Sequence, residues 1–270
     1  MRIVLSLLFL ILAGIFLFSS CRNTETVAGP TVYVTETVDL SSGLVLYYPL
    51  AGNVIDSSGS GLNGVEQNII YGPDRFGTSN SAAAFNGTSS FIRAGDVLDT
   101  VFCKPVARFT VAGWAYTIQP GSSTSGGGMI IGKNGGGLNG PYEFSVTHLE
   151  NNIVADIFFD TLATNYVRLT YPMISRSWFH FALVFDGSLD PTIRAKIYIN
   201  GLELAGSTRI VTGSIGTGCT NSSQHLTIGS GHPQGNPTMP ESQYNGVISD
   251  IRIYNRPLSP SEIVALYSVK

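Results

Sequence analysis

Short apolar stretches recur along most of this chain, separated by turns rich in Gly, Asn, Asp and Ser. The stretches are rich in β-branched and aromatic residues, which is typical of β-strands, and they follow one another roughly every 8 to 15 residues. The clearest stretches are residues 44–49, 109–116, 178–185 and 246–254. This pattern predicts an all-β fold, a two-sheet antiparallel β-sandwich or jelly roll.

Two Asn-Gly pairs each lie between two such stretches and predict β-hairpins. Asn86-Gly87 separates residues 81–85 from 90–93, and Asn200-Gly201 separates residues 195–199 from 202–205. Near the end of the chain the pattern changes to that of one short helix. Ser259 is suited to the N-cap, Pro260 to the first helical position and Glu262 to a capping box.

The first residues of the chain do not fit the strand pattern. Residues 3–18 are almost all apolar after a single basic residue, which is the layout of a secretory signal over residues 1–20. Cys21 follows small residues and resembles the lipidated cysteine of bacterial lipoproteins; cleavage elsewhere nearby is the alternative. Residues 21–42 are polar and lack a period, so they predict a tether, and residues 43–270 predict one domain.

Composition excludes one class of partner. Only 12 % of the residues are charged, the net charge is −3 and no Lys/Arg cluster exists, so nucleic acid is not expected to bind. Cys103 and Cys219 remain besides Cys21. In an exported domain they are predicted to form a disulfide, with two separate thiols as the alternative.

A series of motifs, taken in order, is specific enough to suggest a family. The motifs are residues 44–50, 56–64, 74–77, 84–87, 109–114, 178–180, 198–201, 228–229 and 245–259. Together they resemble the laminin-G-like, concanavalin A-like lectin/glucanase jelly roll of bacterial exported proteins, over about residues 43 to 270. The resemblance implies two antiparallel sheets packed face to face, with the first and last strands side by side.

The same resemblance implies one structural Ca²⁺. Carried over to this chain, its ligands would be Asp250, the carbonyl of Gly87 and an oxygen of the loop over residues 53–56, where Asp56 offers a carboxylate. The alternative for Asp250 is an ion pair with Arg252 or the cap of a turn.

Ligand recognition is expected to involve exposed aromatic residues beside loops, because sugar rings stack on flat apolar faces. Tyr116, Tyr142 and Tyr244 lie next to Gly-, Asn- or Pro-rich loops and are the candidates. Trp114 and Trp178 belong to strongly apolar strands, which favours the core.

No catalytic motif accompanies these residues. Retaining glycosidases need two carboxylates about 5 Å apart; Asp156 and Asp160 come nearest, but neither has a glutamate partner in the expected spacing. His180, between Phe179 and Phe181, is typical of a buried structural histidine. The sequence therefore predicts no enzyme; a polysaccharide hydrolase or lyase is the alternative.

These observations favour a surface-anchored, non-catalytic, lectin-like binding module that recognises glycan or an extracellular protein. A structural envelope lipoprotein that packs on a partner protein is the alternative. Lipid on Cys21 would hold either in the bacterial cell envelope, at the outer membrane or the cell surface.

Overall fold

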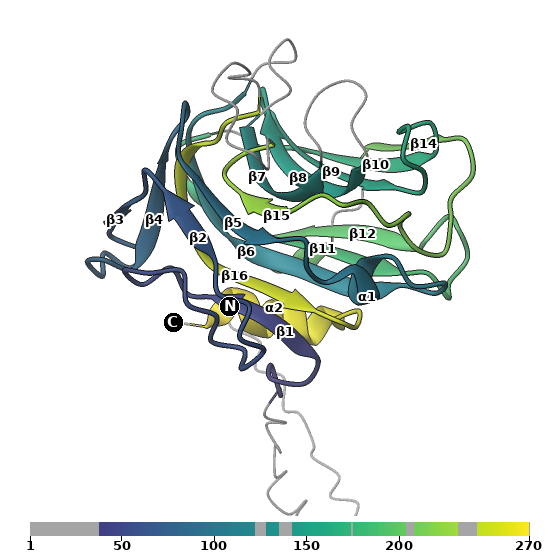
Figure 1. Cartoon of the computed structure of the whole chain (residues 1–270), viewed down its shortest axis with the longest axis horizontal. Helices are drawn as coiled ribbons and strands as arrows, with labels where there is room; N and C mark the ends of the chain where they lie inside the picture. The colour runs from purple at the N-terminus through teal and green to yellow at the C-terminus, as the bar shows by residue number, and fades with distance from the viewer. Residues whose placement is uncertain are drawn as a thin grey trace, which may run out of the picture. The chain divides into compact units, whose positions relative to one another are not determined.

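The chain folds as a sandwich of two antiparallel eight-stranded sheets (Figure 1). The computed structural model describes residues 38–121, 128–134, 142–173, 175–203, 208–231 and 242–269. The predicted signal and Cys21 lie outside the described residues. A compact unit begins at Val38; Leu40 already packs against its hydrophobic residues, and the carbonyl of Leu40 accepts a hydrogen bond from Tyr254 at 3.0 Å.

The first sheet has the strand order β13–β12–β11–β6–β16–β4–β3, and β1 also pairs with β16. Its strands are β1 (Leu44–Tyr48), β3 (Ile70–Gly72), β4 (Ala82–Asn86), β6 (Arg108–Gln119), β11 (Trp178–Asp186), β12 (Ala195–Ile199), β13 (Leu202–Glu203) and β16 (Asn245–Tyr254). Because β1 and β16 are the first and last strands, the expected pairing of the two ends of the domain is confirmed.

The second sheet has the order β14–β10–β9–β8–β7–β15–β5–β2. Its strands are β2 (Val65–Gln67), β5 (Phe91–Gly95), β7 (Gly128–Asn134), β8 (Tyr142–Leu149), β9 (Asn152–Phe158), β10 (Tyr166–Pro172), β14 (Thr208–Thr212) and β15 (Leu226–Ile228). A one-turn helix, α1 (Asp99–Phe102), connects β5 to β6.

Two hydrophobic clusters hold the two sheets and the C-terminal helix together. The larger fills the space between the sheets; alternate residues of β6 and β11, such as Val111 and Phe181, point into it. The smaller lies on the outer side of the first sheet, where α2 (Pro260–Ser268) packs Ile263 and Leu266 against Ala112 and Ala182. Figure 1 shows α2 against this side of the sheet. The helix starts at Ser259 with Pro260 next and the Glu262 capping box formed, as predicted.

The two Asn-Gly pairs behave differently. Asn200 and Gly201 both have positive φ, 51° and 81°, and join β12 to β13 in the predicted two-residue hairpin. The hairpin predicted at Asn86-Gly87 is wrong, because β4 and β5 belong to different sheets. There the Asn86 side chain accepts hydrogen bonds from the N–H groups of Thr88 and Ser89, at 2.9 and 2.8 Å, which widens the turn into a crossing between sheets.

No helix in the described segments is long and apolar enough to span a membrane.

Candidate functional site

Arg75 joins several motifs of the sequence in one buried cluster. Its guanidinium forms an ion pair with Asp250 at 2.7 Å and donates to the carbonyl of Val269 at 2.7 Å. It also lies 4.4 Å from the ring centres of both Phe76 and Trp114. The side chain of Arg75 is only 6 % exposed. The residue therefore connects the 74–77 motif, β6, β16 and the end of α2.

Trp114 extends this cluster towards β11 and α2. Its ring stacks on Tyr267 with a centroid distance of 5.4 Å and meets His180 edge-on at 5.4 Å. The backbone N–H of His180 donates to the side-chain oxygen of Asn200 at 2.9 Å. Trp114 is buried as expected, but against the helix rather than between the sheets. The motifs that suggested the family thus meet in a contact that closes the fold.

Asp56 organises its own loop. Its carboxylate accepts hydrogen bonds from the N–H of Tyr47 at 3.0 Å, from the N–H and hydroxyl of Ser58 at 2.9 Å each, and from the N–H of Leu62 at 3.1 Å. Burial alone would raise the pKa of Asp56, but these hydrogen bonds outweigh it and hold the pKa below its usual value. The carboxylate therefore serves to fix the loop beside β1.

The three residues proposed as calcium ligands do not meet. Asn86 pairs with Asn245, so Gly87 lies at the start of β16. Asp250 comes five residues after Asn245 on β16, which corresponds to roughly 15 Å along an extended strand. It is already engaged by Arg75 at 2.7 Å and by the Tyr47 hydroxyl at 2.9 Å.

This ligand set therefore does not fit a Ca²⁺ ion, whose oxygen ligands all lie within about 2.6 Å. Within the described ranges, no three His, Cys, Asp or Glu side chains are grouped to hold a metal. The alternative for Asp250, an ion pair with Arg252, is present at 3.6 Å, but the shorter ion pair is the one with Arg75 at 2.7 Å.

The three candidate tyrosines have different positions. Tyr244 is fully buried, and its hydroxyl shares a 2.9 Å hydrogen bond with Thr117, so its expected surface role is wrong. Burial raises its pKa. Tyr116 is half-buried on the outer side of the first sheet, with its ring centre 5.9 Å from that of Trp178. Tyr142 begins β8, and its side chain lies outside the described part of the structure.

Cys103 and Cys219 lie on neighbouring segments, because the N–H of Cys219 donates to the carbonyl of Phe102 at 3.0 Å. Both are free thiols in this structure, so it contains separate thiols rather than the predicted disulfide. Burial raises the pKa of both. Cys219 is buried and its thiol donates to the carbonyl of Glu143 at 3.3 Å, which is the packing role of a buried cysteine.

The outer face of the second sheet differs from that of the first. Residues such as Ile157 and Val167 point into the core, so their neighbours along β9 and β10 point outward. No other described helix or strand packs over this outer face. On this face the side chains of Ser145 and Thr147 on β8 are buried, and the side chains become more exposed towards the edge strand β14.

We call the open part of this face the Arg168 strip. It consists of Asp156 and Phe158 on β9, Tyr166, Arg168 and Thr170 on β10, and Thr208, Ile210 and Thr212 on β14.

Within the strip, the Arg168 guanidinium is held by two parallel hydrogen bonds to the Asp156 carboxylate, an arrangement that we call the Arg168 fork. Its Nε and Nη2 donate to the two oxygens of Asp156 at 2.7 and 2.9 Å. The side chain of Arg168 is 38 % exposed, whereas that of Asp156 is 6 % exposed. The hydrogen bonds with Asp156 raise the pKa of Arg168 and keep it charged. Beside it, the half-buried ring of Tyr166 lies 5.7 Å from that of Phe158.

Sequence reasoning did not identify this site. It treated Asp156 only as half of a possible acid pair and did not single out Arg168. Polar residues at alternate positions of two consecutive strands were the available signal. The register that sets Arg168 opposite Asp156 comes only from the structure. Asp160 instead accepts a 2.9 Å hydrogen bond from the N–H of Thr164 in the following loop.

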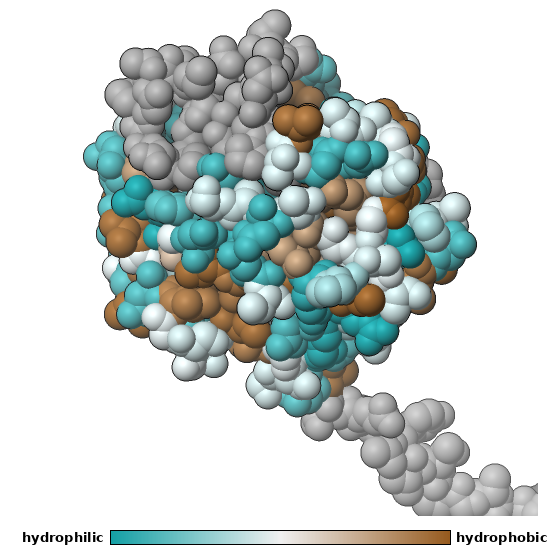
Figure 2. Space-filling model, turned by 45° about the vertical axis from the view of Figure 1, so that its right-hand side comes forward, coloured by the Kyte–Doolittle hydropathy of each residue, from teal (hydrophilic) through white to brown (hydrophobic). Residues whose placement is uncertain are grey.

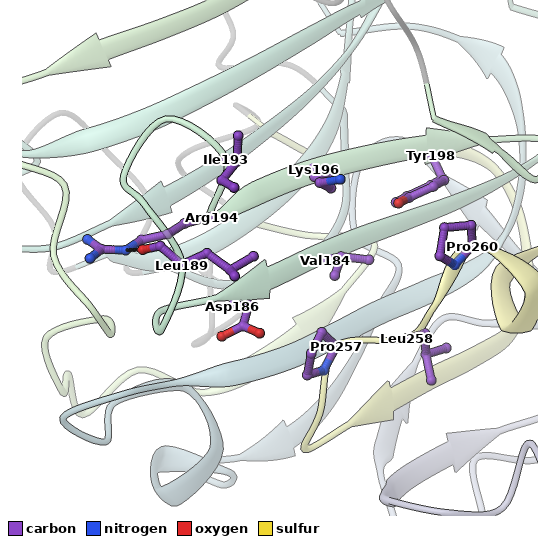
Figure 3. A pocket seen from close by; sticks show the side chains of 10 residues that line it. All are labelled: Val184, Asp186, Leu189, Ile193, Arg194, Lys196, Tyr198, Pro257, Leu258 and Pro260. Atoms are coloured by element: carbon purple, nitrogen blue, oxygen red, sulfur yellow. Dashed lines mark hydrogen bonds between the residues drawn. The ribbon is translucent and has the colours of Figure 1, made fainter.

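A separate pocket of about 160 Å³ lies on the other sheet, between β11–β12 and the segment leading into α2 (Figure 3). Most of its lining is apolar: Val184, Leu189, Ile193, Pro257, Leu258 and Pro260. Of its polar side chains, Lys196 and Tyr198 contact Glu203 at 3.1 and 2.9 Å. The pocket is smaller than the roughly 300–1,000 Å³ usual for ligand sites, and these polar groups already have partners.

The surface as a whole is mixed. Figure 2 shows a face on which hydrophobic residues gather in its lower part, with hydrophilic residues interspersed above them. Exposed hydrophobic side chains occur on several elements, including Phe76, Leu202 and Val264. A mixed surface of this kind is ordinary and does not by itself indicate a binding site.

Comparison with solved structures finds the same sandwich in domain 4 of AbnA, a GH43 extracellular arabinanase from Geobacillus stearothermophilus, in complex with arabinotriose. The identity is 19 % and the TM-score 0.53, over 84 % of this chain and 99 % of that one. The binding domain of botulinum neurotoxin DC, in complex with SialylT, has 14 % identity and a TM-score of 0.58 over 85 % of this chain. The same toxin domain in complex with rat synaptotagmin II has 16 % identity and a TM-score of 0.59 over 85 % of this chain.

This chain spans about half of each toxin domain, 52 % in both cases. At these identities the likeness shows the fold. A family model described as concanavalin A-like lectin/glucanases superfamily, of the laminin G type, matches residues 86–264. The match covers the strands from β5 to β16, which make up most of both sheets, and the first half of α2. The chain therefore belongs to the concanavalin A-like lectin/glucanase superfamily, in its laminin-G-like branch.

Proposed function

We propose that this protein is a non-catalytic binding module that recognises glycan on the Arg168 strip. The observation that carries the proposal is the Arg168 fork, fixed by Asp156 next to the Tyr166 ring on the open end of a sheet face. An aromatic face stacks on the apolar side of a sugar ring, while fixed charged groups hydrogen-bond its hydroxyls.

The rigidity of the fork supports this role. Two of the five N–H donors of the guanidinium point to Asp156, and the exposed part of the side chain leaves donors accessible. Because Asp156 already holds the guanidinium, a ligand would not have to order that side chain on binding. The hydroxyls of Thr170, Thr208 and Thr212 line the same face.

The structural neighbours are consistent with a binding role. One is a domain in complex with arabinotriose, another is a toxin binding domain in complex with SialylT, and a third binds rat synaptotagmin II. Saccharide and protein ligands therefore both occur among proteins that contain this sandwich, and the chain matches about half of the toxin domain. We favour glycan for this chain because the strip offers one aromatic ring and a charged fork rather than a broad apolar patch.

A structural envelope protein that packs on a partner is the second reading, with Ile210 and Val211 at the edge of the sheet, 45 % and 46 % exposed, as its supporting observation. A polysaccharide-degrading enzyme has less support, since Asp156 forms an ion pair with Arg168 and Asp160 accepts a hydrogen bond within its own loop.

Replacing Tyr166 or Arg168 by Ala is expected to weaken glycan binding about 10- to 100-fold, the usual cost of losing a stacking face or a hydrogen bond to a charged group. The glycan is first identified on an array with the full chain and then titrated by calorimetry. Tyr166→Ala keeps the Asp156–Arg168 pair, so it separates lost binding from lost folding. Ile193→Ala, in the separate pocket, is the matched control and should bind normally. Full affinity in both strip variants, or no binding across a broad array by folded protein, would count against the proposal.

We further propose that lipid on Cys21 anchors the module to the bacterial envelope. The supporting observation is the apolar run over residues 3–18 before Ser19, Ser20 and Cys21. Labelled palmitate is expected to appear on the full chain and to be lost in Cys21→Ala. Label retained in that variant would refute the anchor site.

A further inference from the structure

The free sheet edges in the described structure are not alike. β13 has two residues, and β2 and β3 have three each, so these edges are too short to pair stably with a strand of another molecule. The outer edge of β1 is covered, because the carbonyl of Tyr47 accepts from Ser57 at 2.8 Å and its N–H donates to Asp56. β14, at the end of the second sheet, has five residues and pairs only with β10.

β14 also lacks the usual protections of an edge strand. It contains no Pro, and its single charge, Arg209, is turned inward to the carbonyls of Ala195 at 3.0 Å and Pro191 at 2.6 Å. Ile210 on one face and Val211 on the other are 45 % and 46 % exposed. An occupant that covers both faces and satisfies the free backbone groups of alternate residues must itself be a β-strand.

The sequence of β14 is complementary to itself. In an antiparallel pair centred on Ile210, Thr208 lies opposite Thr212 of the second copy, Ile210 opposite Ile210, and Arg209 opposite Val211. The Thr–Thr and Ile–Ile pairs are favourable cross-strand pairs, and no charge faces a like charge. A two-fold axis through Ile210 satisfies both copies with the same contacts, as a closed dimer requires.

We propose that β14 is a homodimer interface, in which the β14 strands of two copies pair antiparallel about Ile210 and join their second sheets into one continuous sheet. Since Ile210 lies opposite Arg168 on β10, the pairing would place two Arg168 strips on one surface. Their β10 strands would lie three strand spacings apart, about 14 Å. The proposal does not depend on glycan binding.

The dimer is tested by light scattering on a sizing column, with protein from about 1 to 100 µM, because an interface of one strand pair is small and expected to be weak. All samples carry Cys21→Ala, so that neither lipid nor a third thiol interferes. We expect a monomer–dimer equilibrium. Ile210→Lys places two ammonium groups opposite each other at the axis and is expected to raise the dissociation constant at least about tenfold.

Ile193→Lys is the matched control, because Ile193 is 49 % exposed but lies in the separate pocket; it should dimerise normally. Cysteine cross-linking then reads the register. Ile210→Cys should form an intermolecular disulfide at the axis, whereas Val211→Cys, which faces Arg209 of the other copy, should not. A monomer up to 100 µM, a dimer insensitive to Ile210→Lys, or equal cross-linking by both cysteine variants would overturn the proposal, whatever the outcome of the glycan titrations.

Discussion

Lys133→Met is expected to lower the free energy of unfolding by about 3–5 kcal/mol, the range for breaking a buried ion pair from one side. The Lys133 side chain is fully buried and contacts three carboxylates: Glu143 at 3.1 Å, Asp96 at 2.8 Å, and Asp99. Glu143 is also fully buried, whereas Asp96 and Asp99 are 37 % and 30 % exposed. Removing the ammonium would leave the buried Glu143 carboxyl without its cation, so it would have to stay charged in the interior or take up a proton, and either outcome costs free energy.

The surroundings of Glu143 make this loss costly. Burial raises the pKa of Glu143, and Lys133 together with two hydrogen bonds from Ser222, at 3.0 and 2.7 Å, opposes that effect. Burial would likewise lower the pKa of Lys133, but the hydrogen bonds with Asp96 and Asp99 and the charge of Glu143 raise it instead. Lys133 thus favours the charged form of Glu143, although burial still leaves the pKa of that carboxyl above its usual value.

Urea unfolding measures the effect, and the chain provides a matched control. Lys196 pairs with Glu203 at 3.1 Å, but those side chains are 36 % and 45 % exposed, so Lys196→Met should cost less than about 1 kcal/mol. The double variant Lys133→Met, Glu143→Leu should recover much of the loss, because an apolar pair leaves no buried charge. Equal effects of Lys133→Met and Lys196→Met would contradict the argument.

Acidification is expected to destabilise the fold through His180, by up to about 1.4 kcal/mol per pH unit between roughly pH 6 and pH 3. His180 is 2 % exposed beneath Trp114 and Tyr267. Burial lowers its pKa to about 3, and the positive charges of Arg252 and Arg75 act in the same direction. In the folded protein the imidazole therefore stays neutral in this range.

The sign follows from proton binding. An unfolded histidine has a pKa near 6.5, so between that value and about 3 the unfolded chain binds a proton that the folded chain excludes. Stability is thus complete above the unfolded pKa and is lost as the pH falls towards the folded pKa. Buried His148, whose pKa is also lowered by burial, adds to the same trend.

His180→Phe isolates the contribution of His180, because it keeps an aromatic ring against Trp114 and removes the titration. The free energy of unfolding of both proteins is measured by urea titration from pH 7 to pH 3. The wild-type value should fall more steeply than that of the variant over this interval. Parallel curves would show that His180 is protonated in the fold or is not buried there.

Much of the architecture was predictable because local chemistry specifies it. The Asn200-Gly201 hairpin needs two consecutive residues with positive φ, which Asn and Gly tolerate, and the α2 capping box is complete in Ser259 and Glu262. The same dipeptide failed at Asn86-Gly87, because pairing with β16 holds β4 in the first sheet while β15 holds β5 in the second. Long-range pairing there outweighs a local turn preference.

The functional residues were predicted less well. Tyr244 lies beside a loop in the sequence, which suggested exposure. In the structure its hydroxyl is buried and hydrogen-bonded to Thr117, which also shares a 2.7 Å hydrogen bond with His148. Asp56 and Asp250 were predicted as calcium ligands, but their observed partners, the backbone of one loop and Arg75, show that both stabilise the fold. Arg75 and Asp250 are 175 positions apart in the sequence, so local sequence patterns do not show that they pair.

By itself the sequence determined the class of fold, the helix with its cap, the hairpin at Asn200-Gly201 and the pairing of the first and last strands. These depend on alternation, on turn residues and on the closure of one domain, all of which act locally or on the whole chain. Only the tertiary structure decided the register that sets Arg168 against Asp156, the edge position of β14 and the burial of Tyr244. Shifting a strand by one residue would exchange its two faces, so the position of a binding face is a property of the assembled sheets.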